Sequence, residues 1–204
     1  MRSLHRAALG LGLLAGGCDS AQAGADTSAP VAFVSASPVD IDYALPDFDL
    51  VDQRGQRVTR ADLSGKVLVV DFIFTRCPTV CPRLTERMAV VQKELASDAD
   101  VRLVSITVDP EHDTPDTLAA YGAKYGADPA RWYFLGGDPE HVQKTVLQGF
   151  KMAVRRVSAE SIDHAERFVL VDRAMHVRGV FETDDAAIAS LVARARELLA
   201  VKAP

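Results

Sequence analysis

Two patterns of apolar residues alternate along this chain. The β-branched and aromatic run from Val67 to Phe74 is typical of a strand buried at the centre of a sheet. After it, apolar residues recur every three or four positions, as on the buried face of a helix: Leu84, Met88, Val91 and Leu95. A strand followed by a helix is therefore the first predicted unit.

The same patterns predict the other elements. Strands are expected at Val101 to Val108, Trp132 to Leu135, Phe168 to Val171 and Val177 to Phe181. Helices are expected from Thr114-Pro115 to Tyr125, from Pro139 to Phe150 and from Ile188 to Leu199. A small N-terminal hairpin is expected from Phe48 to Thr59, with its turn at Gly55.

Strands that alternate with helices predict the α/β class, with a mixed, mainly parallel sheet and helices on both faces. The chain ends with two adjacent strands and a helix, which is the order of the thioredoxin fold. We therefore predict a thioredoxin-like fold with a central mixed sheet.

The N-terminus has the pattern of a targeting segment. A basic start with Arg2 and Arg6 precedes the apolar run Ala7 to Ala15, which is too short to span a bilayer. The sequence Leu14-Ala15-Gly16-Gly17-Cys18 resembles the bacterial lipoprotein box, whose cysteine becomes the lipidated first residue. We predict a lipoprotein-type signal over residues 1–17 and attachment to the membrane through a lipid on Cys18.

Soluble export is the alternative, with cleavage after Ala21-Gln22-Ala23. Both routes place the protein in the periplasm, outside the cytoplasm, where disulfides can form. Residues 18–43 are rich in Ala, Ser, Asp and Pro, and we predict a flexible tether there. The folded domain is expected over residues 44–204.

Composition and charge fit this division and exclude one class of partner. The 204 residues are 48% hydrophobic and 25% charged, as in one globular domain with a short appendage. The net charge of the whole chain is −5. Residues 1–17 hold two arginines and no acids, so the remaining chain has 21 basic and 28 acidic residues and a net charge of −7. An acidic chain without a basic cluster repels phosphate backbones, so nucleic-acid binding is not expected.

Cys77 and Cys81 form the candidate reactive pair, because either export route removes Cys18 from consideration. They lie where a predicted strand gives way to a helix, and unpaired N–H groups at such a junction stabilise a thiolate. If both lie on the helix, their axial separation is about 6 Å, so the pair can close into a disulfide or hold a metal. A permanent disulfide would stabilise the fold little because its loop is short.

Three ordered motifs resemble those of the Sco/SenC family. The segment Cys77 to Pro82 is similar to its CxxxCP signature, whereas thioredoxins have two residues between the cysteines. The segment Ser105 to Thr114 is similar to its S-x-D-P-E-x-D-T motif, and Ile162-Asp163-His164 is similar to its D-H element. The resemblance extends from about Leu45 to Leu199, nearly the whole predicted domain.

In that family the two cysteines and the histidine bind copper, which implies Cys77, Cys81 and His164 as the copper ligands of this chain. Thiolates favour Cu(I), and an added imidazole suits Cu(II). Structural zinc needs four protein ligands, and no fourth residue has suitable spacing. Thioredoxins carry a cis-proline where this chain has Asp163-His164-Ala165, which favours a metal site over a plain dithiol reductase. The segment from Phe150 to His164 is shorter than in many relatives, and no hairpin is expected there.

Other polar residues have less specific interpretations. Asp109 and Asp113 either support the copper ligands or serve a turn and helix cap before Thr114-Pro115, and we favour the turn and cap. Three further histidines are expected at the surface: His112, His141 and His176. Three residues are expected in the core: Met152, Met175 and Trp132.

The resemblance implies a copper metallochaperone, which is not itself an enzyme. It would deliver Cu(I) or Cu(II) to the binuclear centre in the copper-receiving subunit of cytochrome c oxidase, or to another exported copper enzyme. The alternative is a thiol–disulfide oxidoreductase in which Cys77 and Cys81 are catalytic and reduce the cysteines of a copper-site target. A third hypothesis is a redox or copper sensor that binds a partner according to the state of the pair.

Overall fold

The computed structural model describes residues 41–157, 162–164 and 166–201. The predicted signal over residues 1–17 and the predicted tether up to residue 40 lie outside the described residues. Within the described part of the chain, no helix combines the length and the apolar composition needed to cross a membrane.

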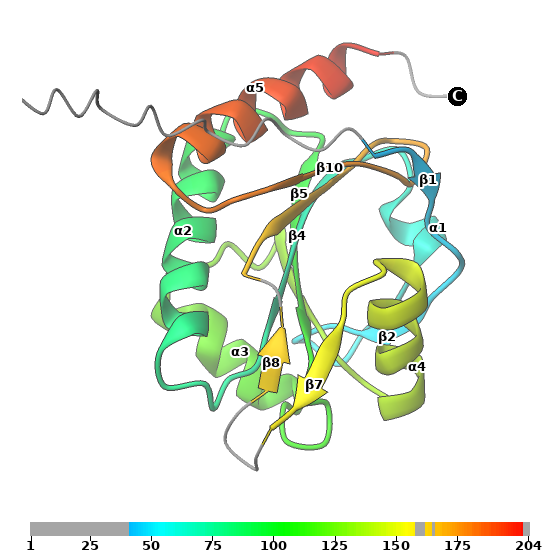
Figure 1. The fold of residues 1–204 in the computed structure, drawn as a ribbon, viewed down its shortest axis with the longest axis vertical. Helices are drawn as coiled ribbons and strands as arrows, with labels where there is room; N and C mark the ends of the chain where they lie inside the picture. Colours follow the sequence, from blue (N-terminus) through cyan, green and yellow to red (C-terminus); the bar gives the residue numbers. More distant parts are fainter. Residues whose placement is uncertain (1–40, 158–161, 165, 202–204) are drawn as a thin grey trace, which may run out of the picture. The chain divides into compact units, whose positions relative to one another are not determined.

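A six-stranded sheet forms the centre of the fold, with the strand order β1-β10-β9-β4-β5-β6 (Figure 1). Its strands are β1 (Tyr43–Ala44), β4 (Val67–Ile73), β5 (Val101–Thr107), β6 (Trp132–Leu135), β9 (Phe168–Val171) and β10 (His176–Phe181). Every residue of β4 is buried between its two neighbours, as its continuous apolar run predicts. The predicted α/β class with a mixed central sheet is confirmed.

The expectation of a mainly parallel sheet is wrong. Among the described strands, β4, β5 and β6 pair in parallel, whereas β1 with β10, β10 with β9 and β9 with β4 pair antiparallel. For β9 and β10 the reason is their connection, because a turn of four residues from Asp172 to Met175 is too short for the crossover that a parallel neighbour requires.

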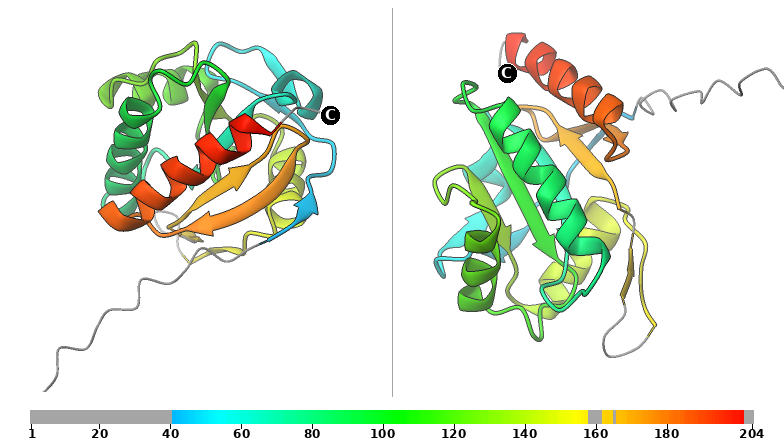
Figure 2. Two further views of the ribbon diagram at one scale, coloured as in Figure 1. Left: turned by 90° about the horizontal axis from the view of Figure 1, so that it is seen from above. Right: turned by 90° about the vertical axis from the view of Figure 1, so that its left-hand side faces the viewer.

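Helices cover both faces of the sheet (Figures 1 and 2). They are α1 (Arg60–Leu63), α2 (Val80–Glu94), α3 (Pro115–Lys124), α4 (Pro139–Lys144), which continues as the π-helical turn η1 (Thr145–Gly149), and α5 (Asp185–Ala200). α2, α3 and α5 share one face: Thr85 of α2 hydrogen-bonds Tyr121 of α3, and Arg87 of α2 pairs with Asp185 of α5. α4 lies on the opposite face.

Two small two-stranded sheets flank this core. β2 (Asp49–Val51) pairs with β3 (Arg57–Thr59), which confirms the predicted N-terminal hairpin. β7 (Val154–Arg156) pairs with β8 (Ile162–His164), so the expectation of no hairpin between Phe150 and His164 is wrong. β7 and β8 have only three residues each, and β7 contains two arginines. Neither β7 nor β8 therefore carries the apolar alternation from which a strand is predicted.

The register of the central strands brings two loops together. β4 and β5 run parallel, with Ile73 opposite Thr107 at their carboxyl ends. The segment after β4 carries Cys77, and the segment after β5 carries Asp109, so both lie at one edge of the sheet. The β7–β8 pair, which carries His164, lies beyond the same edge (Figure 1). The three predicted core residues are buried as expected: Met152, Met175 and Trp132.

Candidate metal centre

The two cysteines occupy different positions at the start of α2. Cys77 lies in the loop before the helix, where its N–H donates to the carbonyl of Phe74 at 3.2 Å. Cys81 lies in the first turn of α2, and its N–H donates to the Cys77 sulfur at 3.3 Å. Cys77 keeps 9% of its surface exposed and Cys81 none, and both are free thiols. The sulfurs are therefore neighbours, with Cys77 the more accessible.

His164 completes the predicted set. Its Nε2 atom lies 3.6 Å from the Cys81 sulfur, although the two residues are 83 positions apart in the sequence. The edge of the imidazole ring packs against Phe74, with ring centroids 6.0 Å apart and planes at 79°. The structure thus brings Cys77, Cys81 and His164 to one place, with two sulfur donors and one nitrogen donor.

The surroundings shift the pKa values of the two thiols in opposite directions. Partial burial raises the pKa of Cys77, but N–H groups of Cys81, Thr79 and Val80 stabilise its thiolate and lower the pKa overall. Burial raises the pKa of Cys81 strongly, and the neighbouring Cys77 and Asp71 add to the rise. Cys77 is therefore the thiol that ionises first.

A charged cluster joins the segments that carry these residues. Asp109 is fully buried, and its Oδ2 accepts a 2.6 Å bond from Arg76, the residue before Cys77. Its Oδ1 accepts a 2.6 Å bond from Arg156 of β7. Burial alone would raise the pKa of Asp109, but Arg156, Arg76 and His112 outweigh it and lower the pKa to about 2. Asp109 therefore remains a carboxylate.

Asp113 also holds the start of the cysteine loop. Its carboxylate accepts bonds from the Thr75 hydroxyl at 2.6 Å, the Thr75 N–H at 3.1 Å and the Thr107 hydroxyl at 2.5 Å. Neither Asp109 nor Asp113 caps α3 with its side chain: the cap is Thr114, whose hydroxyl accepts from the N–H of Thr117. Of the turn and cap interpretation favoured for the two aspartates, the turn is confirmed, since the Asp109 carbonyl accepts the N–H groups of His112 and Asp113. The helix-cap part is wrong, because both carboxylates instead hold residues of the cysteine loop.

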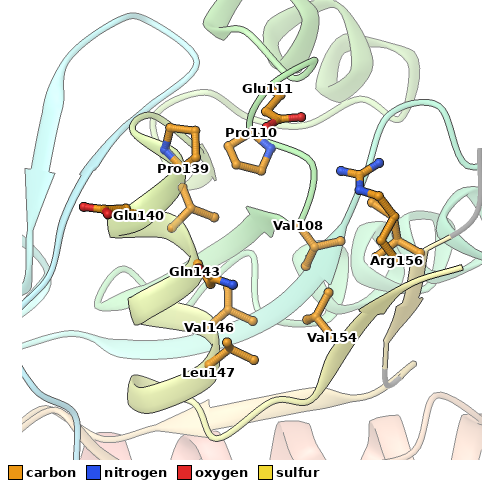
Figure 3. Close-up of a pocket in the computed structure, with 12 residues that line it drawn as sticks. Val108, Pro110, Glu111, Pro139, Glu140, Gln143, Val146, Leu147, Val154 and Arg156 are labelled. Carbon is orange, nitrogen blue, oxygen red and sulfur yellow. The ribbon is translucent and has the colours of Figure 1, made fainter. Parts of the chain in front are cut away.

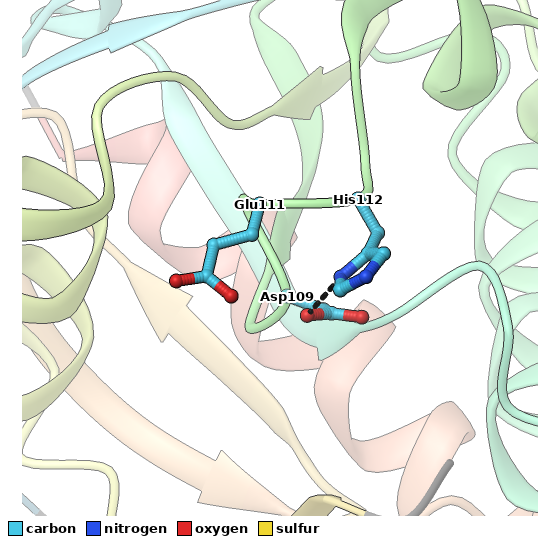
Figure 4. A group of neighbouring side chains, drawn as sticks. All are labelled: Asp109, Glu111 and His112. Atoms are coloured by element: carbon cyan, nitrogen blue, oxygen red, sulfur yellow. Dashed lines mark hydrogen bonds and ion pairs between the residues drawn. The ribbon is translucent and has the colours of Figure 1, made fainter. Parts of the chain in front are cut away.

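A possible cation site among Asp109, Glu111 and His112 does not fit a metal. Their ligand atoms lie within 4.8 Å of one another (Figure 4). Two guanidinium groups already neutralise Asp109, however, and they would repel a cation. The cluster is therefore an ion-pair network. As predicted, His112 and His141 are exposed, whereas His176 is half-buried and pairs with Asp42.

Arg76 and Arg156 are the site residues that sequence reasoning missed. Their contact with Asp109 depends on the approach of segments 33 and 47 positions away, which local patterns do not record. A hollow of about 310 Å³ lies beside Arg156, between η1 and the β7–β8 pair (Figure 3). Val108, Val146 and Val154 line it, so one side of the hairpin faces an apolar surface.

The sequence and the fold match known proteins over most of the chain. The family model described as SCO1/SenC matches residues 40–200. A SCO1 protein homologue of Bacillus subtilis (strain 168) is 37% identical over 134 residues, which are 64% of this chain and 69% of that protein.

Several solved structures have the same fold over most of this chain. A SCO1/SenC family lipoprotein from Bacillus anthracis str. Ames is 31% identical, with a TM-score of 0.72 over 80% of this chain and 98% of that chain. ScoI from Bradyrhizobium japonicum with copper bound is 30% identical, with a TM-score of 0.68 over 77% of this chain and 100% of that chain.

The third structure is that of BsSco, a member of the Sco family of cytochrome c oxidase assembly proteins in which a disulfide switch has been identified. It is 30% identical, with a TM-score of 0.73 over 80% of this chain and 98% of that chain. These likenesses confirm the thioredoxin-like fold that the order of elements predicts.

Proposed function

Because the chain belongs to the SCO1/SenC family, we propose that it is a copper metallochaperone for an exported copper enzyme. The family includes cytochrome c oxidase assembly proteins and a relative solved with copper bound. The proposed recipient is the subunit that holds the binuclear copper centre of cytochrome c oxidase, and copper is the cargo. The proposed ligands are Cys77, Cys81 and His164.

The observation that supports this proposal most strongly is the meeting of three donors from two distant segments. The Cys81 sulfur lies 3.6 Å from His164 Nε2, and the Cys77 sulfur accepts the N–H of Cys81. Two thiolates suit Cu(I), and a set that adds an imidazole also accepts Cu(II). This donor set is suited to a carrier that holds copper in either oxidation state.

The opposite pKa shifts of the two thiols suit stepwise loading. Cys77 has the lowered pKa and is the less buried of the two thiols, so it meets an incoming copper ion as a thiolate. Cys81 has the raised pKa and binds copper only when its proton leaves. Copper binding should therefore release a proton, and acid should favour copper release.

We propose that the protein works at the periplasmic face of a membrane, anchored through a lipid on Cys18. The lipoprotein-like box before Cys18 supports this, and one structural relative is a lipoprotein. In this arrangement residues 1–17 are the signal, residues 18–43 the tether and residues 44–204 the copper-binding domain. Soluble export with cleavage after Ala23 is the alternative.

The ligand set is tested by the His164→Ala variant. We expect its Cu(II) affinity to fall about tenfold or more, and its Cu(I) affinity to fall by less than about threefold, because two thiolates still suit Cu(I). Competition titrations against chelators of known affinity measure both values. His141→Ala, which removes an exposed histidine on α4, is the control. Equal losses for the two oxidation states would remove His164 from the ligand set.

A second candidate function is reduction of disulfides in a copper-site target. The opposite pKa shifts of Cys77 and Cys81 support it. The Cys77 thiolate would attack a target disulfide and form a mixed disulfide while one target thiolate leaves. The Cys81 thiol would then lose its proton and attack the Cys77 sulfur. The target would leave as a dithiol, with two electrons gained, and Cys77 and Cys81 would be left as a disulfide.

This candidate is tested by trapping the intermediate. A Cys81→Ser variant cannot resolve a mixed disulfide, so it should accumulate a covalent adduct with an oxidised copper-site target peptide. A Cys77→Ser variant should form none, because Cys81 is fully buried and its pKa is raised. Equal adduct yields from the two variants would contradict the assignment of Cys77 as the attacking residue.

A further inference from the structure

His164 stands on a hairpin that the central sheet does not hold. β7 and β8 pair only with each other among the described strands, and neither shares a backbone ladder with the six-stranded sheet. A hairpin of three-residue strands is only marginally stable alone. The position of His164 relative to the cysteines therefore depends on side-chain contacts.

Several contacts of the described residues hold the hairpin, among them the packing of His164 against Phe74 and Cys81. Ile162 is buried and Val154 half-buried, and Val154 lies against the hollow beside η1 (Figure 3). Such apolar contacts are non-directional and leave the hairpin free to shift. A strong directional contact comes from Arg156, which lies opposite Ile162 in the register and donates to Asp109 Oδ1 at 2.6 Å.

The same carboxylate also holds the cysteine loop. Arg76 donates to Asp109 Oδ2 at 2.6 Å through one guanidinium nitrogen and at 3.2 Å through another, and Cys77 is the next residue. Each oxygen of a single fully buried carboxylate thus binds an arginine from a different ligand-bearing segment. Asp109 lies two residues after the end of β5, with only Val108 between them, so it is fixed to the central sheet.

This link differs from an ordinary surface ion pair. Arg156 is 42% exposed, but Asp109 is 0% exposed. When one partner of a buried charge is removed, the charge remains poorly compensated, and the local structure must rearrange or admit water. Loss of Arg156 should therefore move the hairpin rather than only remove a charge.

We propose that Arg156 is a positioning residue that holds His164 within reach of the cysteine pair, through Asp109 and Arg76. The inference rests on the proposed function, because it concerns how this chain presents its third copper ligand. Arg156 does not bind copper. Its loss should lower the affinity for Cu(II), which needs the imidazole. The affinity for Cu(I), which the two thiolates hold, should stay nearly unchanged.

The first test compares Arg156→Gln with a matched control. Arg167→Gln also removes one arginine near His164, but Arg167 pairs with Glu182, and both are about half exposed. We expect Arg156→Gln to weaken Cu(II) binding about tenfold and to shift or broaden the thiolate-to-Cu(II) absorption bands, as for loss of an outer partner of a metal ligand. Arg167→Gln should match the wild type. Wild-type bands and Cu(II) affinity in Arg156→Gln would overturn the inference.

A double-mutant cycle separates positioning from general stability. If Arg156 acts through His164, Arg156→Gln should change Cu(II) affinity by less than about twofold once His164 is alanine. An equal loss with and without His164 would overturn the inference and leave the ligand set intact. A His164→Ala variant with wild-type Cu(II) affinity would overturn both the inference and the proposed function.

A conservative variant and a copper-free measurement extend the test. Arg156→Lys keeps the charge and one bond to Asp109, so its Cu(II) affinity should recover to within about threefold of the wild type. In the copper-free protein, amide hydrogen exchange in β7 and β8 should speed up in Arg156→Gln and not in Arg167→Gln. Unchanged exchange in the hairpin would overturn the inference.

Discussion

Cys77 and Cys81 are four positions apart, yet the structure gives them different chemistry. Cys77 lies in the loop, where three backbone N–H groups stabilise its thiolate, whereas Cys81 is fully buried in the first turn of α2. Their sequence spacing predicts a pair but not this division, because it does not show how the loop turns before the helix. Under the proposed function, the less buried Cys77 thiol should receive copper or a disulfide first, and the fully buried Cys81 thiol should follow.

Asp71 is a second residue whose chemistry depends on burial. It lies in the middle of β4 with no exposed surface, and neither of its oxygens has a hydrogen-bond partner among the described residues. Burial raises the pKa of this carboxyl to about 7, because the Ser105 hydroxyl nearby on β5 compensates too little for the lost solvation. Near neutral pH, Asp71 is therefore a partly protonated acid close enough to Cys81 to raise the pKa of that thiol.

This carboxyl should make the copper-free protein less stable as the pH rises. The folded pKa of Asp71 lies above the unfolded value, so the folded state binds more protons between about pH 4 and pH 7. Stability from this group is present below the unfolded pKa and falls by roughly 1.4 kcal/mol per pH unit through that window. In Asp71→Asn this fall should disappear.

Urea denaturation of the reduced protein at pH 5.5 and pH 7.5 measures the effect. The wild type should lose about 2 kcal/mol more than Asp71→Asn between these values. Asp47→Asn, which changes an exposed carboxyl before β2, is the control and should follow the wild type. Identical pH dependence in the wild type and Asp71→Asn would show that Asp71 is already ionised at low pH in the folded protein.

Residue types in the sequence predict the three proposed ligands but not the residues that support them. Cysteine and histidine have recognisable metal chemistry, so Cys77, Cys81 and His164 can be proposed as ligands from motifs. Arg76 and Arg156 resemble any surface arginine until folding brings them to Asp109. Charged pairs formed between distant segments leave no local pattern, and for that reason they could not be predicted.

At the scale of elements, a helix or strand can be predicted when its apolar residues form a long and regular pattern. β4, β5 and α2 have long apolar runs or clear helical spacing, and the predicted elements match them closely. β7 and β8 are short and largely polar, and they form because tertiary contacts hold them. The predicted helix from Pro139 to Phe150 is also present, but its second half widens into the π-helical turn η1.

The packing of α3 on β6 illustrates a limit of local propensity. Gly122 lies on the buried side of α3, and a Cβ placed there would meet the Phe134 ring at 2.7 Å. Phe134 is itself held between Trp132 and Tyr121, with ring centroids 5.2 and 6.2 Å away. The ring has little freedom to move, so the close approach of helix and strand requires glycine.

Gly122→Ala should therefore destabilise the protein. Helix propensity alone predicts a gain of about 1 kcal/mol, whereas overpacking against Phe134 predicts a loss of about 1–3 kcal/mol. We expect the loss to prevail, with a lower midpoint in thermal or urea unfolding. Ala123→Gly at the adjacent exposed position is the control and should cost about 1 kcal/mol by propensity. A stabilised Gly122→Ala variant would contradict the packing argument.

For the molecule as a whole, topology explains why the site forms where it does. The parallel pair β4 and β5 places the cysteine loop and Asp109 at one edge of the sheet. The chain then crosses through β6 and α4 before the β7–β8 hairpin returns to that edge with His164. The fold class could be predicted from the alternation of elements, but the path of this return could not, because no sequence pattern marks the hairpin.

The claim that Cys77, Cys81 and His164 form one copper site is tested most directly by titrating the reduced protein with Cu(II) and recording visible absorption. We predict intense thiolate-to-copper charge-transfer bands that saturate near one copper per chain. The bands should be lost in Cys77→Ala and in Cys81→Ala, and weakened in His164→Ala. Clean oxidation to a disulfide without such bands would contradict the claim and favour the thiol–disulfide oxidoreductase.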